Sequence, residues 1–157
     1  MENLIEKESV KRVNDFIKQF DSSLEIIVLD KTAKTAKDAA YALNCEVGAI
    51  IKSLVLRANG NFLLCLVAGD KRCSLNKVKK LIAKKDVRMA DAEQVKSQTG
   101  FSIGGVAPVA HLSKLNVLID KSLQRFQNVF GAAGHPNCVF KVSYGQLVKI
   151  TNGSEKE

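Results

Sequence analysis

The sequence predicts one α/β (α+β) domain with a curled mixed β-sheet, barrel-like in its core, flanked by helices. The chain has 157 residues, close to the roughly 150 of an average domain. Its composition, 46% hydrophobic and 25% charged with two prolines, is that of a globular protein. Helices and hairpins follow one another irregularly, which favours a mixed sheet over a doubly wound one. We assign residues 1–150 to the domain and 151–157 to a flexible tail.

Hydrophobic periodicity and turn signals divide the chain into helices and strands. Ser9 is expected to cap the first helix, Asn59-Gly60 to form a hairpin turn, and Gly100 to end a helix. In chain order we expect a helix over 9–20, a strand over 24–29, a helix over 35–44, strands over 50–56 and 62–68, a helix over 74–85, a strand over 87–90, a helix over 91–100, a strand over 116–119, a helical turn over 121–126, a strand near 129, a loop over 131–137, a strand over 138–142 and a helix to about 150.

The positive charge of the chain is concentrated in one segment. The net charge is +8, and residues 71–88 hold eight basic residues against the single acid Asp86. On the expected helix, Lys77, Lys80 and Lys84 fall on the face opposite the apolar residues. Two interpretations remain open, a solvated helix face or a contact with the phosphate backbone of a nucleic acid. The segment has no aromatic residue, so stacking on single-stranded bases is not expected.

Several protein classes are excluded by what the sequence lacks. It has no apolar run of about 18 residues and no secretory leader, so we expect a soluble, cytoplasmic protein without a membrane partner. The four cysteines form no CxxC pair and only two histidines are present, so buried free thiols are favoured over a zinc site or a redox dithiol. The GxSxG, Walker, HExxH and GxGxxG motifs are absent. Neither a metal nor a cofactor is expected.

Lys52 is the first unusual residue, because it lies in an apolar strand. Alternation places its side chain on the face of Ile50 and Leu54, whereas Ser53 points to the other face. One interpretation is an edge position from which the ammonium group reaches water. The other is a cation in the wall of a pocket for an anionic or carbonyl-bearing substrate.

Two segments rich in small residues provide further candidates. Gly104–Pro108 combines adjacent glycines with a proline, which suits a rigid carbonyl-binding loop and equally an ordinary surface turn. The loop over 131–137 places His135 near it, although a single histidine is often only structural. Asp120 ends a strand and is also a natural N-cap for the following turn.

Taken in chain order, these fragments resemble the YbaK/EbsC family of aminoacyl-tRNA deacylases, relatives of the editing domain inserted in bacterial prolyl-tRNA synthetases. The resemblance extends from about Thr35 to Leu147. It rests on the alanine-rich helix before Ile50-Ile-Lys-Ser-Leu-Val, Val67-Ala-Gly-Asp70 before the lysine-rich helix, Thr99-Gly-Phe-Ser-Ile-Gly-Gly-Val-Ala-Pro108, Val117-Leu-Ile-Asp120 and Gly131-Ala-Ala-Gly134.

The resemblance implies the family's fold and hydrolysis of the ester that joins a wrong amino acid to the 3′-terminal ribose of tRNA. It implies that Lys52 binds the terminal phosphate or the amino acid, and that the backbone from Gly105 to Pro108 positions the scissile carbonyl. His135 resembles the histidine of alanine-preferring relatives, and Ser53 stands where some relatives have asparagine. The residues implied to line the substrate pocket are Ser53, Gly104, Val106, Ala107, Asp120, Gly131, Gly134 and His135.

The leading functional prediction is a trans-editing hydrolase that removes a small wrong amino acid (Ala, Ser, Thr or Cys) from tRNA for proline. It requires Lys52 and Gly104–Pro108 to converge on one acyl group. Lys77, Lys80 and Lys84 are candidates for the acceptor-stem backbone, and prolyl-tRNA synthetase is a candidate second partner; DNA is not an expected ligand. The alternatives are a non-catalytic tRNA-binding or synthetase-associated module and a small-molecule hydrolase.

Overall fold

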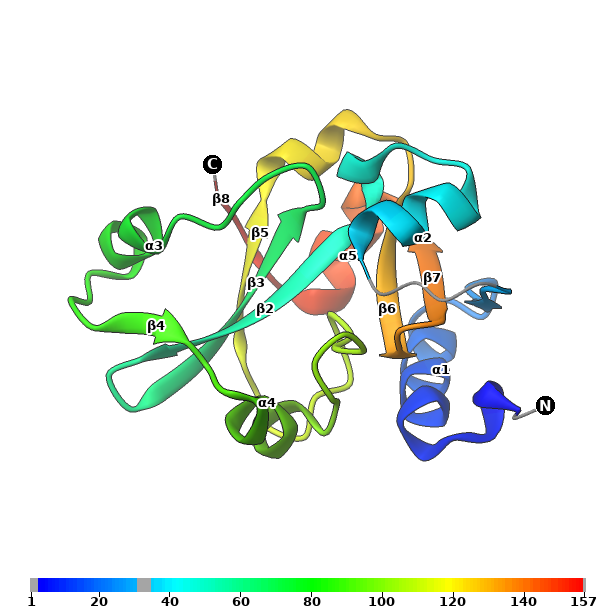
Figure 1. Ribbon diagram of the computed structural model, residues 1–157, viewed down its shortest axis with the longest axis horizontal. Helices are drawn as coiled ribbons and strands as arrows, with labels where there is room; N and C mark the ends of the chain where they lie inside the picture. Colours follow the sequence, from blue (N-terminus) through cyan, green and yellow to red (C-terminus); the bar gives the residue numbers. More distant parts are fainter. Residues whose placement is uncertain (1–2, 31–34, 157) are drawn as a thin grey trace.

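A computed structural model describes residues 3–30 and 35–156 as two β-sheets with helices around them (Figure 1). The strands are β1 (Ile26–Val28), β2 (Ile51–Ala58), β3 (Asn61–Ala68), β4 (Val87–Met89), β5 (Asn116–Asp120), β6 (Val129–His135), β7 (Cys138–Val142) and β8 (Ser154–Lys156). The α-helices are α1 (Glu8–Phe20), α2 (Ala36–Leu43), α3 (Leu75–Ile82), α4 (Ala92–Thr99) and α5 (Tyr144–Thr151). Short 3-10 helices are η1 (Leu4–Glu6), η2 (Val47–Ala49) and η3 (Lys121–Arg125).

The strand order confirms a mixed sheet architecture. Five strands are arranged β4-β2-β3-β5-β8, and three are arranged β1-β7-β6. Strand β5 runs parallel to both β3 and β8, whereas β2 is antiparallel to β3 and β4. A single parallel bridge between Ile50 and Phe130 links the start of β2 to β6. This bridge is the junction between the two sheets.

The main core lies between the two sheets and the helices α1 and α5. Figure 1 shows α5 between β5 and β6, with α1 at the end of the smaller sheet. The fully buried side chains Ile17, Leu64, Phe140 and Leu147 come from α1, β3, β7 and α5, and all belong to one cluster. A second cluster, which includes Leu56, Cys65 and Val78, fills the space between the larger sheet and α3. Each face of the larger sheet is therefore covered by a different set of elements.

Side-chain caps explain where three of the helices begin. Thr35 accepts a hydrogen bond from the Asp38 backbone N–H at the start of α2. Asp91 with Gln94, and Ser143 with Gln146, form reciprocal capping boxes at α4 and α5. Gly100 ends α4 with a φ of 80°, as predicted.

Ser9 differs from its prediction as the cap of α1. The helix begins at Glu8 after the N-cap Lys7, whose side chain makes no capping hydrogen bond. The hydroxyl of Ser9 instead donates to the Gly134 carbonyl at 2.9 Å. The residue that was expected to start the helix therefore joins α1 to the distant strand β6.

Three other segments differ from their predictions. Helix α3 ends at Ile82 because Ala83 adopts the left-handed conformation (φ 57°), so Lys84 lies beyond the helix. Residues 131–135, expected as a loop, continue strand β6. Within the expected flexible tail, Ser154–Lys156 form β8 at the edge of the larger sheet; Glu157 lies outside the described residues. Among the helices described, none has the length and apolar character needed to cross a bilayer.

Candidate functional site

The two faces of β2 carry different candidate residues. Lys52 lies on the face of Leu54 and Leu56, which pack in the cluster beneath α3. Ser53 lies on the opposite face with Ile51 and Val55, which belong to the main core. The hydroxyl of Ser53 is buried and has no hydrogen-bond partner within the structure. The alternation predicted from the sequence is therefore present.

The ammonium group of Lys52 is held against the loop that follows β3. Lys52 is half-buried, and its Nζ donates a short hydrogen bond to the Lys71 carbonyl. Lys71 follows the turn at Gly69, which packs so closely on η2 that a Cβ there would lie 2.2 Å from the Val47 carbonyl oxygen. Only a glycine fits this contact, so the turn that presents the Lys71 carbonyl is fixed.

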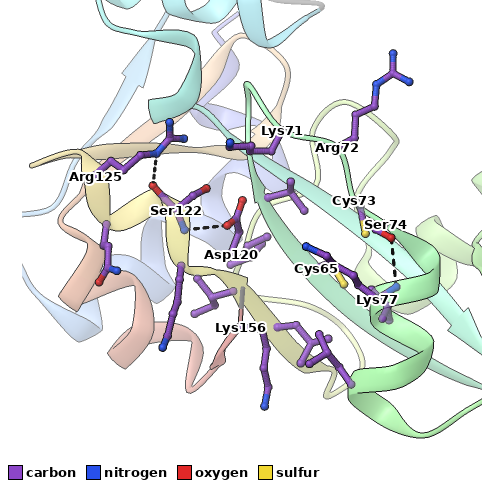
Figure 2. A pocket seen from close by; sticks show the side chains of 18 residues that line it. Cys65, Lys71, Arg72, Cys73, Ser74, Lys77, Asp120, Ser122, Arg125 and Lys156 are labelled. Carbon is purple, nitrogen blue, oxygen red and sulfur yellow. Dashed lines mark hydrogen bonds between the residues drawn. The ribbon is translucent and has the colours of Figure 1, made fainter.

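Beside this loop lies a cavity of about 490 Å³ with a strongly cationic lining, which we call the basic pocket (Figure 2). It opens between α3, the ends of β3 and β5, and η3. Its apolar floor includes Leu66, Val78, Leu118 and Ile119. The charged side chains that line it are one carboxylate, Asp120, and six cations: Lys71, Arg72, Lys77, Lys121, Arg125 and Lys156. Such a combination suits an anion that carries an apolar group.

Asp120 holds one wall of the basic pocket together. Its carboxylate accepts hydrogen bonds from the backbone N–H of Ala68, at 3.1 Å, and of Ser122, at 2.8 Å. The first bond ties β5 to β3 and the second caps η3. The N-cap role considered for Asp120 is therefore confirmed, and its side chain also lines the cavity.

A bidentate ion pair closes the same end of the sheet. The Arg125 guanidinium donates to both carboxylate oxygens of Asp70, at 2.8 and 3.0 Å, and lies 4.8 Å from the ring centroid of Phe126. The hydrogen bond from Arg125 holds the pKa of Asp70 below its ordinary value. Because both partners are substantially exposed, solvent weakens the pair, and its main contribution is geometric.

The glycine-proline segment packs against β6. The Gly134 N–H donates to the Gly105 carbonyl at 3.1 Å, and a Cβ at Gly105 would lie 3.0 Å from the backbone nitrogen of His135. A Cβ at Gly131 would lie 3.0 Å from the Pro108 ring. Gly105 thus lies close to the backbone of β6, and Gly131 lies close to the Pro108 ring, which explains why both positions favour a residue without a side chain.

Helix α1 braces this segment through residues that were not predicted. The Arg12 guanidinium donates to the carbonyls of Ala110, at 2.9 Å, and Thr99, at 3.0 Å, and lies 4.5 Å from the Phe101 ring centroid. The His111 Nε2–H donates to the Ala107 carbonyl at 2.7 Å. Segment Gly104–Pro108 is therefore fixed from both ends, as a rigid loop requires.

Protonation of His111 is expected to destabilise the fold, because it places a positive charge in a buried site near Arg12. Burial, helped by the nearby charge of Arg12, lowers the pKa of His111 below 6.5, although its bond to Ala107 partly opposes the shift. Below about pH 6.5 the unfolded chain binds a proton that the folded chain does not, so the stability present above that pH declines as the pH falls. Urea unfolding across this range checks the slope. In His111→Gln the slope of the free energy of unfolding against pH should be smaller; an unchanged slope contradicts the assignment.

The predicted site residues form two groups around the junction of the sheets. Asp120 and Lys77 line the basic pocket, and Lys52 adjoins it through Lys71. The second group consists of Gly104, Gly105, Val106, Ala107, Pro108, Gly131, Gly134 and His135. No hydrogen bond among the described residues joins Lys52 to Gly104–Pro108, and their convergence on one acyl group remains a prediction.

His135 takes part in a turn, and the three predicted lysines lie on the surface. The Nδ1 of His135 accepts a hydrogen bond from the Asn137 N–H at 3.0 Å, which closes the turn before β7. Lys77 and Lys80 are exposed on α3, whereas Lys84 follows the helix and is not on the same helical face.

Sequence reasoning missed Arg12, Asp70, His111 and Arg125, whose partners are mostly far away in the chain. Among the described residues, no group of three or more His, Cys, Asp or Glu is placed to hold a metal ion.

Comparisons of the sequence and the structure with known proteins all indicate the same family. Residues 30–150 match the model of a family described as an aminoacyl-tRNA editing domain. An uncharacterized protein of Bacillus subtilis, YwhH, is 31% identical over 144 residues, which cover 91% of each chain. The proline–tRNA ligase of Thermosipho africanus is 29% identical over 101 residues, which cover 64% of this chain and 18% of the ligase. A solved structure named as a candidate trans-editing enzyme for prolyl tRNA synthetase has a TM-score of 0.91 and 34% identity, with 96% of both chains covered.

Proposed function

Because the chain belongs to the aminoacyl-tRNA editing domain family, we propose that it is a trans-editing hydrolase of mischarged tRNA. The proposed substrate is tRNA for proline that carries Ala, Ser, Thr or Cys, and the proposed place of action is the cytoplasm. The similarity to proline–tRNA ligases and to a candidate trans-editing enzyme supports both the reaction and the choice of tRNA.

The observation that carries this proposal is the bridge between Ile50 and Phe130. It sets the start of β2, two residues before Lys52, beside β6. Gly131, the next residue of β6, faces the Pro108 ring. This adjacency supports a site at the junction, with Lys52 and Gly104–Pro108 proposed to reach it from its two sides. An aminoacyl end that lies across this junction would contact both.

The chemistry suits a site that has few catalytic side chains. An aminoacyl ester is already activated, so orienting a water molecule and stabilising the oxyanion provide catalysis without a covalent nucleophile. In this proposal the Lys52 ammonium binds the terminal phosphate or the amino acid. The backbone from Gly105 to Pro108 positions the carbonyl. The small residues of this segment and of β6 admit a small side chain and exclude a larger one, which is the logic of a double sieve.

In this proposal the basic pocket contacts the rest of the tRNA end. Its six cations suit phosphates, and its apolar floor suits a base or a ribose. Lys77 lines the pocket and Lys80 lies on the same exposed helix, so both remain candidates for contact with the acceptor stem. Lys84 is a weaker candidate because α3 ends before it. Prolyl-tRNA synthetase remains a proposed second partner.

The alternative is a non-catalytic module that binds tRNA or a synthetase. The observation that favours it is the basic pocket itself, since cations alone give affinity for RNA without any hydrolysis.

A deacylation panel tests the proposed function and separates it from the alternative. The purified chain is incubated with tRNA for proline charged with Ala, Ser, Thr, Cys or Pro, and with correctly charged Ala-, Ser- and Thr-tRNA. Hydrolysis of a mischarged proline tRNA, with Pro-tRNA spared, supports trans-editing. Salt-sensitive binding without hydrolysis of any substrate supports the binding module. Equal hydrolysis of a free aminoacyl ester shows that the tRNA is not recognised.

Replacing Lys77 with alanine is expected to weaken tRNA binding and to reduce its dependence on salt. If Lys77 neutralises one phosphate, the slope of log K against log salt becomes smaller by roughly 1 unit. Filter binding over a range of salt concentrations measures this slope. Lys114→Ala serves as the matched control because it removes the same charge from an exposed residue outside the pocket lining and outside residues 71–88. An equal effect of the two substitutions would mean that only net charge matters.

A further inference from the structure

Two cysteines share one wall of the basic pocket. Cys65 lies on β3 and is only 4% exposed, whereas Cys73 is half-buried in the segment that joins β3 to α3. Both side chains line the cavity and pack in the same apolar cluster (Figure 2). They are eight positions apart in the sequence, so a search for CxxC spacing does not detect them.

The surroundings make the two thiols unequal. A hydrogen bond between the thiols and the charge of Lys52 lower the pKa of Cys73 to about 7, although burial and the Asp120 carboxylate oppose this. The same hydrogen bond, together with burial, raises the pKa of Cys65. Lys71, Arg72 and Lys77 line the same cavity and add positive charge. Cys73 is therefore the thiolate of the pair near neutral pH, and Cys65 is its protonated partner.

The other two cysteines provide an internal contrast. Burial raises the pKa of Cys45, helped by the charge of Glu46, and burial alone raises the pKa of Cys138. Neither lies in the lining of the basic pocket. Both are therefore expected to react slowly with oxidants and alkylating agents.

We propose that Cys73 and Cys65 form a peroxide-sensitive dithiol, a modification site in the wall of the basic pocket. The Cys73 thiolate attacks one oxygen of hydrogen peroxide, an S–O bond forms as the O–O bond breaks, and the leaving hydroxide takes up a proton. The product is a sulfenic acid at Cys73 and one molecule of water. Cys65 then loses its proton, and its sulfur attacks the sulfur of Cys73. The S–S bond forms, the S–O bond breaks and a second water leaves, so that peroxide has accepted the two electrons.

Formation of the disulfide would alter the loop whose Lys71 carbonyl binds the Lys52 ammonium group. The new bond would tie Cys73 to β3, and Cys73 is two residues from the carbonyl of Lys71 that binds the Lys52 ammonium. The segment between β3 and α3 would have to adjust, since Cys65 is fixed within the sheet. Any consequence for deacylation rests on the proposed function, whereas formation of the disulfide does not.

Peptide mapping after peroxide treatment tests the proposal on the intact chain. The reduced protein is exposed to hydrogen peroxide at neutral pH, the remaining thiols are alkylated, and the digest is analysed by mass spectrometry. A Cys65–Cys73 linkage is expected in the wild type and in the matched control Cys45→Ser. Cys65→Ser should stop at a sulfenic acid at Cys73, which dimedone traps. Oxidation of Cys45 or Cys138 as fast as Cys73, or linkage only between separate chains, overturns the proposal.

A second measurement keeps the test valid if a serine variant does not fold. In the wild-type chain, the alkylation rate of Cys73 should reach half its maximum near pH 7 and exceed that of Cys45 at that pH by about tenfold or more. Lys52→Gln should shift the Cys73 profile to higher pH. An unchanged profile overturns the role given to Lys52. A chain that forms the disulfide but hydrolyses no tRNA refutes the proposed function alone, and the reverse outcome refutes the dithiol alone.

Discussion

Replacing Lys52 with alanine is expected to reduce the rate of deacylation by about 10²-fold or more while leaving the fold intact. The reason is that this residue supplies a positive charge beside the junction where the aminoacyl end is proposed to bind, and loss of one such electrostatic group typically costs this much. A single-turnover assay with mischarged proline tRNA measures the change in the chemical step itself. It avoids a contribution from slow product release.

The fold of the Lys52→Ala chain is expected to be nearly unchanged, since the side chain is half-buried and donates its hydrogen bond to the carbonyl of the exposed residue Lys71. Thermal unfolding checks this point. Lys114→Ala, at an exposed residue outside the lining of the basic pocket, is the control for loss of one positive charge. A single-turnover rate that stays at the wild-type level in Lys52→Ala would remove this residue from the mechanism.

Replacing Gly134 with alanine is expected to destabilise the domain by about 2–5 kcal/mol. Gly134 has a φ of 88°, and a Cβ there would lie 2.6 Å from the carbonyl oxygen of Ser9 in α1. The clash is with backbone rather than with a flexible side chain, so α1 must move away from β6. That movement would also break the hydrogen bond from the Ser9 hydroxyl to the Gly134 carbonyl. Chemical denaturation measures the loss.

Gly145→Ala provides a matched control for this substitution. Gly145 lies in the first turn of α5, its φ is not positive, and no atom comes within 4 Å of a Cβ placed there. The same chemical change should therefore stabilise the protein by about 0.5–1 kcal/mol through helix propensity. If Gly134→Ala and Gly145→Ala shift stability in the same direction, close packing of α1 on β6 is not what constrains Gly134.

Local signals were sufficient to predict most of the fold. The helix expected over 91–100 matches α4, which the Asp91–Gln94 capping box starts and the predicted Gly100 ends, and Asn59-Gly60 located the β2–β3 hairpin. These features depend on residues a few positions apart, so their physical cause is visible in the sequence itself. Alternation along β2 likewise placed Lys52 and Ser53 on opposite faces of the strand, as the structure has them.

Several differences arise where pairing or packing with another segment overrides local preference. Gly131–His135 has the composition of a loop, but pairing with β7 extends it as a strand. The segment Ser154–Lys156 is polar and looks frayed, but pairing with β5 orders it. Ser9 is a suitable helix cap, but the Gly134 carbonyl binds its hydroxyl instead. For Ser154–Lys156 and Ser9 the deciding partner lies far away in the chain, whereas the partner of Gly131–His135 is the strand that follows it.

The same reason limits what the sequence shows of the candidate site. Charge counting found the lysines of residues 71–88, but nothing local indicates that Arg125 pairs with Asp70 across 55 positions. Nor does any spacing reveal that Arg12 braces the segment that follows Thr99. The resemblance to the deacylase family implied a role for the two small-residue segments. The packing of Gly131 on Pro108 explains why these segments need small residues.

The parallel pairing of β3 with β5 has a consequence for how the protein is made. The β2–β3 hairpin joins neighbouring residues and can form early, whereas β5 must wait for more than forty residues of intervening chain that include α3 and α4. Arg125 and Lys156 follow later still. During synthesis, therefore, the apolar floor beneath α3 is expected to stay open until β5 has paired with β3, and Arg125 and Lys156 complete the cationic lining of the pocket last.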